Sequence, residues 1–459
     1  AKVGAILVNI NPAYRTHELE YVLRESGVRL LFSASTFKTS DYAAMIDEVS
    51  GGVGALERTV FVDRPEWIDF CAGEPDREAI AARMATLSFD DPINIQYTSG
   101  TTGFPKGATL THHNILNNGF FVTELLGIGE DDVTCLPVPL YHCFGMVMGN
   151  LGTFAQGGCV VLPAPSFEPL ATLEAVAAEG VTSLYGVPTM FIAMLGHEDF
   201  DSFDLSSLRT GIMAGSPCPI EVMKKVVDRM HMAEVAICYG MTETSPVSTQ
   251  TRVDDPLERR VGTVGRAGPH VEIKVINPET GLVVERGQPG ELCTRGYSVM
   301  LGYWPTHPTP SPLTAEAVDT AGWMRTGDLA TMDDDGYLNI VGRSKDMIIR
   351  GGENIYPREI EEFLHGHDAI ADVQVVGVPD EKYGEELCAW VLPRTGADLD
   401  EDAVRDFCRG RLAHFKVPRY VIFVDQFPMT ITGKVQKFRM RDASIERLGL
   451  EEAAAVRNA

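Results

Sequence analysis

Residues 97–107, which read YTSGTTGFPKG, bring together groups that could bind a phosphate. The run holds three glycines, four Ser or Thr hydroxyls and one lysine. It follows residues 93–97, where apolar and polar side chains alternate as in a strand. Glycines allow backbone N–H groups to approach an anion closely, and the lysine adds charge. We predict a phosphate-binding loop composed of Thr98, Ser99, Gly100, Thr101, Thr102, Gly103 and Lys106.

The spacing differs from that of the P-loop nucleoside triphosphatases, which require G-x-x-x-x-G-K-[ST]. Counting from Gly100 or Gly103 places Pro105 or Ala108 where the second glycine should stand. The alternative is a flexible surface loop. Pro105 stiffens the run, and a surface loop has no need of the lysine, so the anion-binding interpretation is favoured.

A second cluster, Tyr239-Gly240-Met241-Thr242-Glu243, follows a strand-like run at 235–238. Ligands of α/β sheets bind at the carboxyl ends of strands. An aromatic ring can stack on adenine, a glycine admits close approach, and a carboxylate is a hard oxygen ligand for Mg²⁺. The residues themselves leave open a helix cap at Thr242 and a solvated Glu243.

Two further short motifs could complete a nucleotide site. In Thr326-Gly327-Asp328, the aspartate could accept both ribose hydroxyls, although a turn aspartate is the alternative. Lys434 follows Thr432-Gly433 near the end of the chain. A fixed cation there could bridge a carboxylate and a phosphate during attack, although a solvated surface lysine is the alternative.

These four motifs, in this order, resemble those of the adenylate-forming (AMP-binding) superfamily: acyl-CoA synthetases, firefly-type luciferases and peptide-synthetase adenylation domains. The resemblance covers essentially the whole chain and is greatest to medium- and long-chain fatty acid–CoA ligases. It implies an enzyme that uses ATP, Mg²⁺ and coenzyme A to convert a fatty acid to acyl-AMP and then to acyl-CoA. An adenylate-forming ligase that loads a carrier protein and a non-catalytic nucleotide- or acyl-binding protein are the alternatives.

The resemblance also implies roles for individual residues. Tyr239 stacks on adenine, Thr242 contacts the α-phosphate and Glu243 ligates Mg²⁺. The implied catalytic residues are Lys434, Thr242, Glu243 and Lys106. The remaining nucleotide and CoA contacts are Gly215 and Ser216 beside adenine, Gly240 and Met241 in the second motif, Asp328 and Arg343 at the ribose, Lys345 as hinge, and Gly351 and Gly352 along the pantetheine arm of CoA.

The acyl pocket is predicted from apolar residues near the motifs. His142 stands in a mostly apolar segment, 139–146, that by resemblance flanks this pocket, although a hydrogen-bonded core histidine is the alternative. No aspartate stands in this segment to bind a substrate amine, which favours an uncharged tail. The candidate wall residues, each of which could equally be core, are Tyr185, Val187, Phe191, Met213, Met241 and Val247.

The pattern of elements predicts an α/β protein. We expect a large N-terminal domain, 1–344, made of two doubly wound α/β subdomains (1–162 and 167–249) and a small β-barrel-like subdomain. Within the latter, 270–276 and 281–284 are predicted to form a hairpin. A small mobile α+β C-terminal domain, 345–459, follows a hinge at Lys345, with strands at 371–378 and 389–392 and a helix over 401–412.

Composition limits the possible partners. The 459 residues carry a net charge of −25, which argues against nucleic acid or an anionic membrane. Nine cysteines without a C-x-x-C pair predict reduced, mostly buried thiols of a soluble intracellular protein, in the cytoplasm or, in a eukaryote, the mitochondrial matrix. The chain opens at Ala1 inside a running fold, so we expect a missing N-terminal segment. Small-molecule substrates are the expected partners, and the sequence leaves open whether the protein forms a homodimer.

Overall fold

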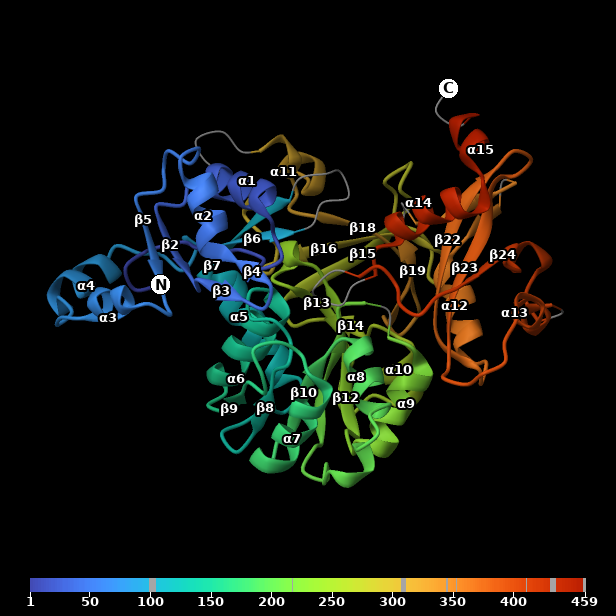
Figure 1. The fold of residues 1–459 in the computed structure, drawn as a ribbon, viewed down its shortest axis with the longest axis horizontal. Coiled ribbons are helices and arrows are strands. Elements are labelled where there is room, and N and C mark those ends of the chain that lie inside the picture. Colours follow the sequence, from blue (N-terminus) through green and yellow to red (C-terminus); the bar gives the residue numbers. More distant parts are fainter. Residues whose placement is uncertain are drawn as a thin grey trace.

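The computed structural model describes residues 1–98, 105–216, 218–306, 311–343, 346–351, 353–409, 411–429 and 435–456. It confirms the predicted mixed α/β class, with a large N-terminal domain and a small C-terminal domain (Figure 1). All nine cysteines are free and seven are buried, as predicted. Within these ranges, no helix has both the length and the apolar character that a membrane crossing requires.

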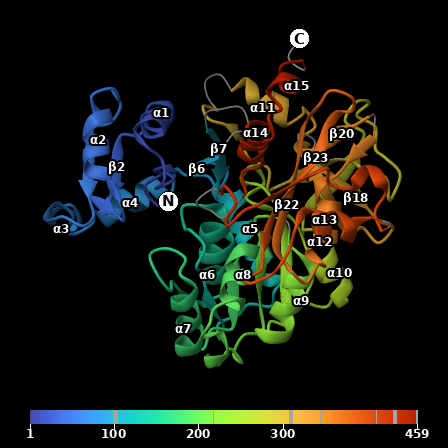
Figure 2. The same cartoon turned by 45° about the vertical axis from the view of Figure 1, so that its right-hand side comes forward.

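The first segment forms a small lobe set beside the body of the molecule (Figure 2). Its elements are α1 (Thr16–Ser26), β2 (Leu30–Ser33), β3 (Thr36–Phe37), β4 (Ser40–Asp41), α2 (Tyr42–Ser50), β5 (Arg58–Phe61), α3 (Pro65–Cys71) and α4 (Arg77–Met84). The first predicted α/β subdomain, 1–162, does not have a single sheet, because its strands are divided among several sheets. Among the described residues, strand β2 pairs with β5 alone, whereas β1 (Leu7–Asn9) joins β6 of the body, where the Asn94 side chain binds the Leu7 carbonyl.

The phosphate-loop motif joins two strands of a four-stranded mixed sheet in the order β1-β6-β7-β17. Strands β6 (Pro92–Thr98) and β7 (Lys106–Thr111) form an antiparallel hairpin, and β17 (Gly302–Tyr303) pairs with the far edge of β7. Helix α5 (His112–Glu124) then begins where Thr111 caps it by accepting a hydrogen bond from the Asn114 backbone N–H.

The largest sheet has seven strands in the order β14-β13-β12-β11-β10-β8-β9. Its parallel strands are β8 (Val133–Cys135), β9 (Cys159–Val161), β10 (Ser183–Gly186), β11 (Thr210–Ala214) and β12 (Glu234–Gly240), and its antiparallel ones are β13 (Val247–Gln250) and β14 (Arg266–Ala267). Helices α5, α7 (Pro169–Glu179), α9 (Ile220–Arg229) and α10 (Leu257–Gly262) contact it.

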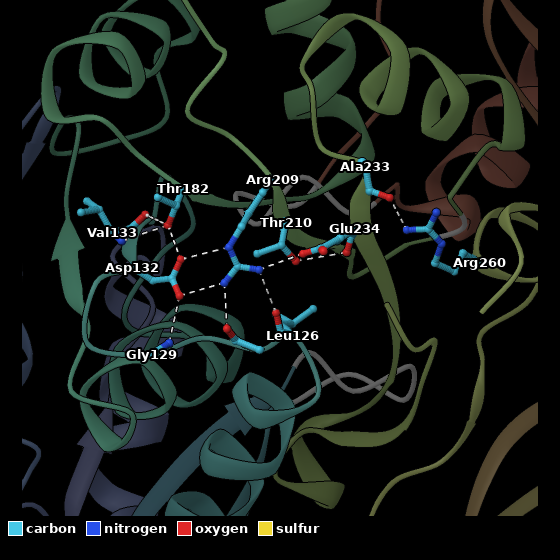
Figure 3. Close-up of polar contacts among 11 residues, drawn as sticks. Leu126, Gly129, Asp132, Val133, Thr182, Arg209, Thr210, Ala233, Glu234 and Arg260 are labelled. Atoms are coloured by element: carbon cyan, nitrogen blue, oxygen red, sulfur yellow. Dashed lines mark hydrogen bonds and ion pairs between the residues drawn. The ribbon is translucent and has the colours of Figure 1, made fainter. Parts of the chain in front are cut away.

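The predicted subdomain boundary near 162 is therefore displaced, because β8 and β9 belong to this second sheet. Arg209 links the segments at the start of several of these strands (Figure 3). Its guanidinium binds Asp132 before β8, Glu234 in β12 and the Leu126 and Gly127 carbonyls, which ties the amino ends of these strands together. The shorter elements of this part are η1 (Phe144–Leu151, a π-helix), α6 (Gly152–Ala155), α8 (Pro188–Leu195), η2 (Phe200–Ser202) and η3 (Thr242–Thr244).

A four-stranded antiparallel sheet follows, in the order β15 (Val271–Ile276), β16 (Gly290–Gly296), β18 (Met324–Met332) and β19 (Leu338–Arg343), with α11 (Pro312–Ala317) between β17 and β18. The predicted hairpin is present but short: Ile276 bridges Val283, and the Val284 N–H donates to the Val275 carbonyl at 3.0 Å. The longer partner of β15, with which it pairs along its length, is β16. A period of two specifies a strand but not its neighbour. The sheet is open, with β15 and β19 at its edges.

The C-terminal domain is α+β, as predicted. Its elements are β20 (Ile348–Arg350), β21 (Glu353–Ile355), α12 (Pro357–His365), β22 (Ile370–Asp380), β23 (Gly384–Pro393), α13 (Glu401–Cys408), η4 (His414–Lys416), β24 (Tyr420–Phe423), α14 (Lys437–Leu448) and α15 (Glu451–Val456). The helix predicted over 401–412 thus ends at Cys408. Ser344 and Lys345 lie outside the described residues, so the boundary and the hinge remain predictions.

Candidate active site

Three neighbouring parallel strands of the large sheet deliver predicted site residues to one edge. Strand β10 ends just before Val187, β11 just before Gly215, and β12 contains Tyr239 and Gly240 at its end. Gly215 has a φ of +91°, and a side chain there would approach Val187 within 3.2 Å. Ser216, which follows it, is partly buried.

Tyr239, Asp328 and Arg343 form one hydrogen-bonded group. The Tyr239 hydroxyl donates to Asp328 Oδ2 at 2.7 Å, and Arg343 Nε donates to Asp328 Oδ1 at 3.1 Å. Burial and the Asp328 charge raise the pKa of Tyr239, so its phenol stays protonated and donates. Asp328 is only 8% exposed. One carboxylate, held at both oxygens, therefore lies at the hydroxyl end of the Tyr239 ring, where β12 ends.

The turn after Tyr239 depends on Gly240. A Cβ at this position would lie 1.8 Å from the Pro246 carbonyl oxygen, so no other residue fits without moving the backbone. That oxygen accepts from Met241 N at 2.9 Å and from Thr244 Oγ1 at 2.8 Å, which closes the turn. Thr242 and Glu243 are thereby buried at the sheet edge.

Glu243 and Lys106 meet at a residue that sequence reasoning missed, Tyr303 in β17. Its hydroxyl donates to Glu243 Oε1 at 2.7 Å, and Lys106 Nζ lies 5.3 Å from the centre of its ring. Burial and the Glu243 charge raise the pKa of Tyr303. A buried carboxylate beside the stem of a phosphate loop fits Mg²⁺, which takes one or two protein carboxylates together with substrate phosphates. No group of three or more His, Cys, Asp or Glu side chains that could hold a metal occurs among the described residues.

The structure describes only some of the remaining predicted site residues. Thr98 ends β6, and its hydroxyl donates to the Lys106 carbonyl at 3.4 Å. Gly351 lies in the small domain, where its N–H binds the Tyr383 carbonyl at 2.8 Å. The predicted residues that lie outside the described ones are Ser99, Gly100, Thr101, Thr102, Gly103, Lys345, Gly352 and Lys434.

The predicted acyl-pocket residues gather in the core behind this edge. Tyr185, Phe191 and Met213 are fully buried, and Val187 and Val247 are 5% exposed. Met241 is partly buried in a neighbouring cluster. The Tyr185 ring stacks on Phe144 at 6.1 Å between centroids. Their role as pocket walls remains a prediction.

The His142 segment is attached to the phosphate hairpin by Gln96, a second residue that sequence reasoning missed. The Gln96 amide donates to the Tyr141 carbonyl and accepts from Cys143 Sγ at 3.0 Å. His142 Nδ1 accepts from the Phe144 N–H at 3.1 Å, at the start of the π-helix η1. In the alternating strand, Gln96 resembled a solvent-facing residue, so no sequence signal marked it.

Comparison with known proteins identifies the family. The AMP-binding enzyme family matches residues 1–304, and the AMP-binding enzyme C-terminal domain matches residues 359–434. The chain belongs to the AMP-binding enzyme family. The resemblance seen in the four sequence motifs is thus confirmed.

Relatives of this AMP-binding enzyme are similar over nearly its whole length. It is 47% identical to YngI of Bacillus subtilis, provisionally named an acyl-CoA synthetase, over 99% of this chain and 85% of the relative. It is 43% identical to the mitochondrial medium-chain acyl-CoA ligase ACSF2 of Bos taurus, over 98% of this chain and 77% of the relative.

Two solved structures share the fold. ATP-bound MatB from Rhodopseudomonas palustris has a TM-score of 0.80 at 32% identity, covering 96% of this chain and 84% of that one. The anthranilate CoA ligase AuaEII, solved with anthranoyl-AMP, has a TM-score of 0.83 at 28% identity, covering 96% and 83%. These matches support an acyl-CoA synthetase over the carrier-loading and non-catalytic alternatives.

Proposed function

We propose that this AMP-binding enzyme is an AMP-forming acyl-CoA synthetase that activates medium- or long-chain fatty acids. The observation that carries the proposal is the meeting, at one sheet edge, of a Tyr239–Asp328–Arg343 group and a Glu243–Tyr303–Lys106 group. The first offers an aromatic face and a fixed carboxylate to a nucleoside. The second offers a cation and a buried carboxylate beside the phosphate-loop stem.

In the first half-reaction, adenine stacks on Tyr239, and the ribose hydroxyls bind Asp328 and Arg343. A carboxylate oxygen of the fatty acid attacks the α-phosphorus, the bond to the bridging oxygen breaks, and pyrophosphate leaves. Thr242 and Lys106 hold phosphate oxygens. Glu243 would hold Mg²⁺, which offsets phosphate charge when bound. We assign Lys434 to the bridging cation, because two anions must approach each other.

In the second half-reaction, the CoA thiolate attacks the acyl carbonyl and AMP leaves. AMP is a far better leaving group than the oxide of the free acid, which is why the reaction is divided into two steps. We assign the change between steps to rotation of the small domain about Lys345. This rotation withdraws Lys434 and brings Gly351 and Gly352 toward the pantetheine arm.

The acyl tail is assigned to the apolar region around His142, Tyr185, Val187, Phe191, Met213 and Val247. ACSF2 is named for medium-chain acids, which favours that length for this enzyme. ACSF2 is also named mitochondrial, whereas YngI is bacterial. We therefore place this enzyme inside the cell, in the cytoplasm or the mitochondrial matrix, with small-molecule partners.

The test is AMP release by the purified protein with ATP, Mg²⁺ and saturated acids from butyrate to palmitate, each with and without CoA. Steady release that needs CoA and has its maximum at a medium or long chain is the expected result. Acid-dependent pyrophosphate exchange without CoA-dependent turnover would instead indicate a ligase with another acyl acceptor. Absence of both activities would contradict the proposal.

A further inference from the structure

Glu25, near the end of α1, contacts one stem of the phosphate-loop hairpin and also Trp304, which follows the neighbouring strand β17. Its carboxylate Oε2 accepts a hydrogen bond from the Tyr97 hydroxyl on β6. Its backbone carbonyl accepts from Trp304 Nε1 at 3.1 Å. Tyr97 and Trp304 lie 72 and 279 positions after Glu25 in the sequence. The two contacts therefore reach from the N-terminal lobe into the body of the molecule. None of the four nucleotide motifs includes Glu25.

The contact with Tyr97 acts on the strand that leads into the loop. Tyr97 pairs with Gly107 across the hairpin, and a Cβ on Gly107 would lie 3.1 Å from the Tyr97 ring. The ring therefore lies across the opposite strand, and its hydroxyl reaches α1. Burial and Glu25 raise the pKa of Tyr97, so the phenol is the donor. A hydrogen bond to a carboxylate is stronger than a neutral one.

The contact with Trp304 acts on the strand that leaves the loop. The Trp304 backbone N–H donates to the Gly107 carbonyl at 2.7 Å, immediately after Lys106. Trp304 also follows Tyr303, the residue that binds Glu243 and faces Lys106. The two ends of the hairpin and the Lys106–Tyr303–Glu243 group thus share one support, the end of α1.

We propose that Glu25 is a positioning residue that holds the phosphate-loop hairpin in register, so that α1 of the N-terminal lobe sets the geometry of the nucleotide site. The role in catalysis rests on the proposed function, whereas the mechanical role does not. Figure 2 shows how separate the lobe otherwise is from the body. Helix α1 therefore supports the active site and also contributes to the small hydrophobic core of the N-terminal lobe.

Three variants isolate the contact. Glu25→Ala removes the carboxylate and leaves the backbone carbonyl that Trp304 binds. Tyr97→Phe removes the hydroxyl and keeps the ring over Gly107. The double variant tests whether both act through the same bond. Glu20→Ala is the matched control, because Glu20 lies on the same helix and forms an exposed ion pair with Arg24.

The first measurement is hydrogen exchange of the unliganded protein. We expect Glu25→Ala and Tyr97→Phe to speed exchange in residues 92–111 while helix α5 and the large sheet keep their wild-type protection. Faster exchange throughout the protein, or unchanged exchange in the hairpin, would overturn the positioning role. This measurement tests whether Glu25 holds the hairpin in place, even if the protein lacks the proposed activity.

The second measurement is acid-dependent ATP–pyrophosphate exchange. Each single variant should raise the KM for ATP about tenfold, with the fatty-acid KM and the Glu20→Ala enzyme unchanged. The double variant should be no worse than either single one. An unchanged KM for ATP, or a double variant that multiplies the two effects, would overturn the proposal. A wild-type protein without exchange activity would instead refute the proposed function.

Discussion

Tyr303 lies between Lys106 of the phosphate-loop stem and Glu243, the predicted metal ligand. Its hydroxyl oxygen makes the contact with Glu243. Tyr303→Phe removes the hydroxyl that binds Glu243 but keeps the ring that faces Lys106. We expect the Mg²⁺ concentration for half-maximal pyrophosphate exchange to rise about tenfold, because a hydrogen bond to a charged group contributes about 1.5–3 kcal/mol. Titration of exchange activity with Mg²⁺ measures this. An unchanged Mg²⁺ requirement would show that Glu243 needs no such orientation.

Because Asp372 in β22 is buried, we predict that the free energy of unfolding depends on pH. Burial raises the pKa of this carboxyl from its usual value near 3.8 to about 7, with a smaller increase from Glu361, while the Val373 N–H and Gln374 lower it. Its Oδ1 lies 3.4 Å from His365 Nε2, and burial lowers the pKa of that histidine. Since the folded protein favours the protonated acid, this contribution is complete below about pH 4 and is lost as the pH rises through about 7.

Asp372→Asn should remove that dependence, because the amide has the same shape and does not ionise. Urea unfolding of both proteins from about pH 5 to about pH 8 measures the difference. The variant should gain stability relative to the wild type as the pH rises. A constant difference across this range would mean that Asp372 stays ionised in the fold.

At the scale of single residues, the sequence predicted the site residues that lie within motifs. It missed the residues outside the motifs that contact them. Tyr239, Asp328 and Arg343 were predicted for one nucleotide, and the structure brings them into direct contact. Tyr303 and Gln96 carry no local signal, because each acquires its role only when a distant element packs against it.

Among the elements, the amino end of the large sheet depends on Arg209 (Figure 3). Its ion pairs with Asp132 and Glu234 both measure 2.8 Å, and the Asp132 side chain is only 11% exposed. Arg209→Met should lower the free energy of unfolding by about 2–3 kcal/mol, because it leaves Asp132 without its cation. Urea denaturation measures this loss.

The matched control is Arg229→Met, which breaks an exposed pair with Asp201 and should cost no more than about 1 kcal/mol. Equal losses in the two variants would show that Arg209 is an ordinary surface pair. Activity at saturating ATP should survive in both, because Arg209 lies at the opposite ends of these strands from Tyr239 and Gly240.

Most elements followed from local pattern, but strand partners did not. The helix predicted over 401–412 begins at Glu401 as α13, and the strands predicted at 371–378 and 389–392 lie within β22 and β23. Strand β15 and its short hairpin to 281–284 were predicted, but its longer pairing with β16 was not. A strand's pairing is decided by tertiary contacts, such as the Arg209 network that draws β8 into the second sheet, and these leave no periodic signal.

At the scale of the whole molecule, the chain has three parts: the N-terminal lobe, the rest of the large domain and the small domain (Figures 1 and 2). The sequence predicted two of them. It did not predict that residues 16–84 would form a lobe distinct from the sheet carrying the phosphate hairpin, because the α/β rhythm continues across the junction.

The division of labour between the domains leads to a prediction for Lys434. If this lysine of the small domain serves only the attack on the α-phosphate, Lys434→Ala should slow acid-dependent pyrophosphate exchange about 100-fold or more. The same variant should still convert supplied acyl-AMP and CoA to acyl-CoA at close to the wild-type rate, because that step proceeds after the lysine has withdrawn. Lys416→Ala is the control, since Lys416 lies in the same domain and pairs with Glu359. Stopped-flow or quenched assays of each half-reaction measure both rates. Full adenylation activity in Lys434→Ala would refute the assignment, and equal loss of both half-reactions would mean that the two domains do not alternate between two arrangements.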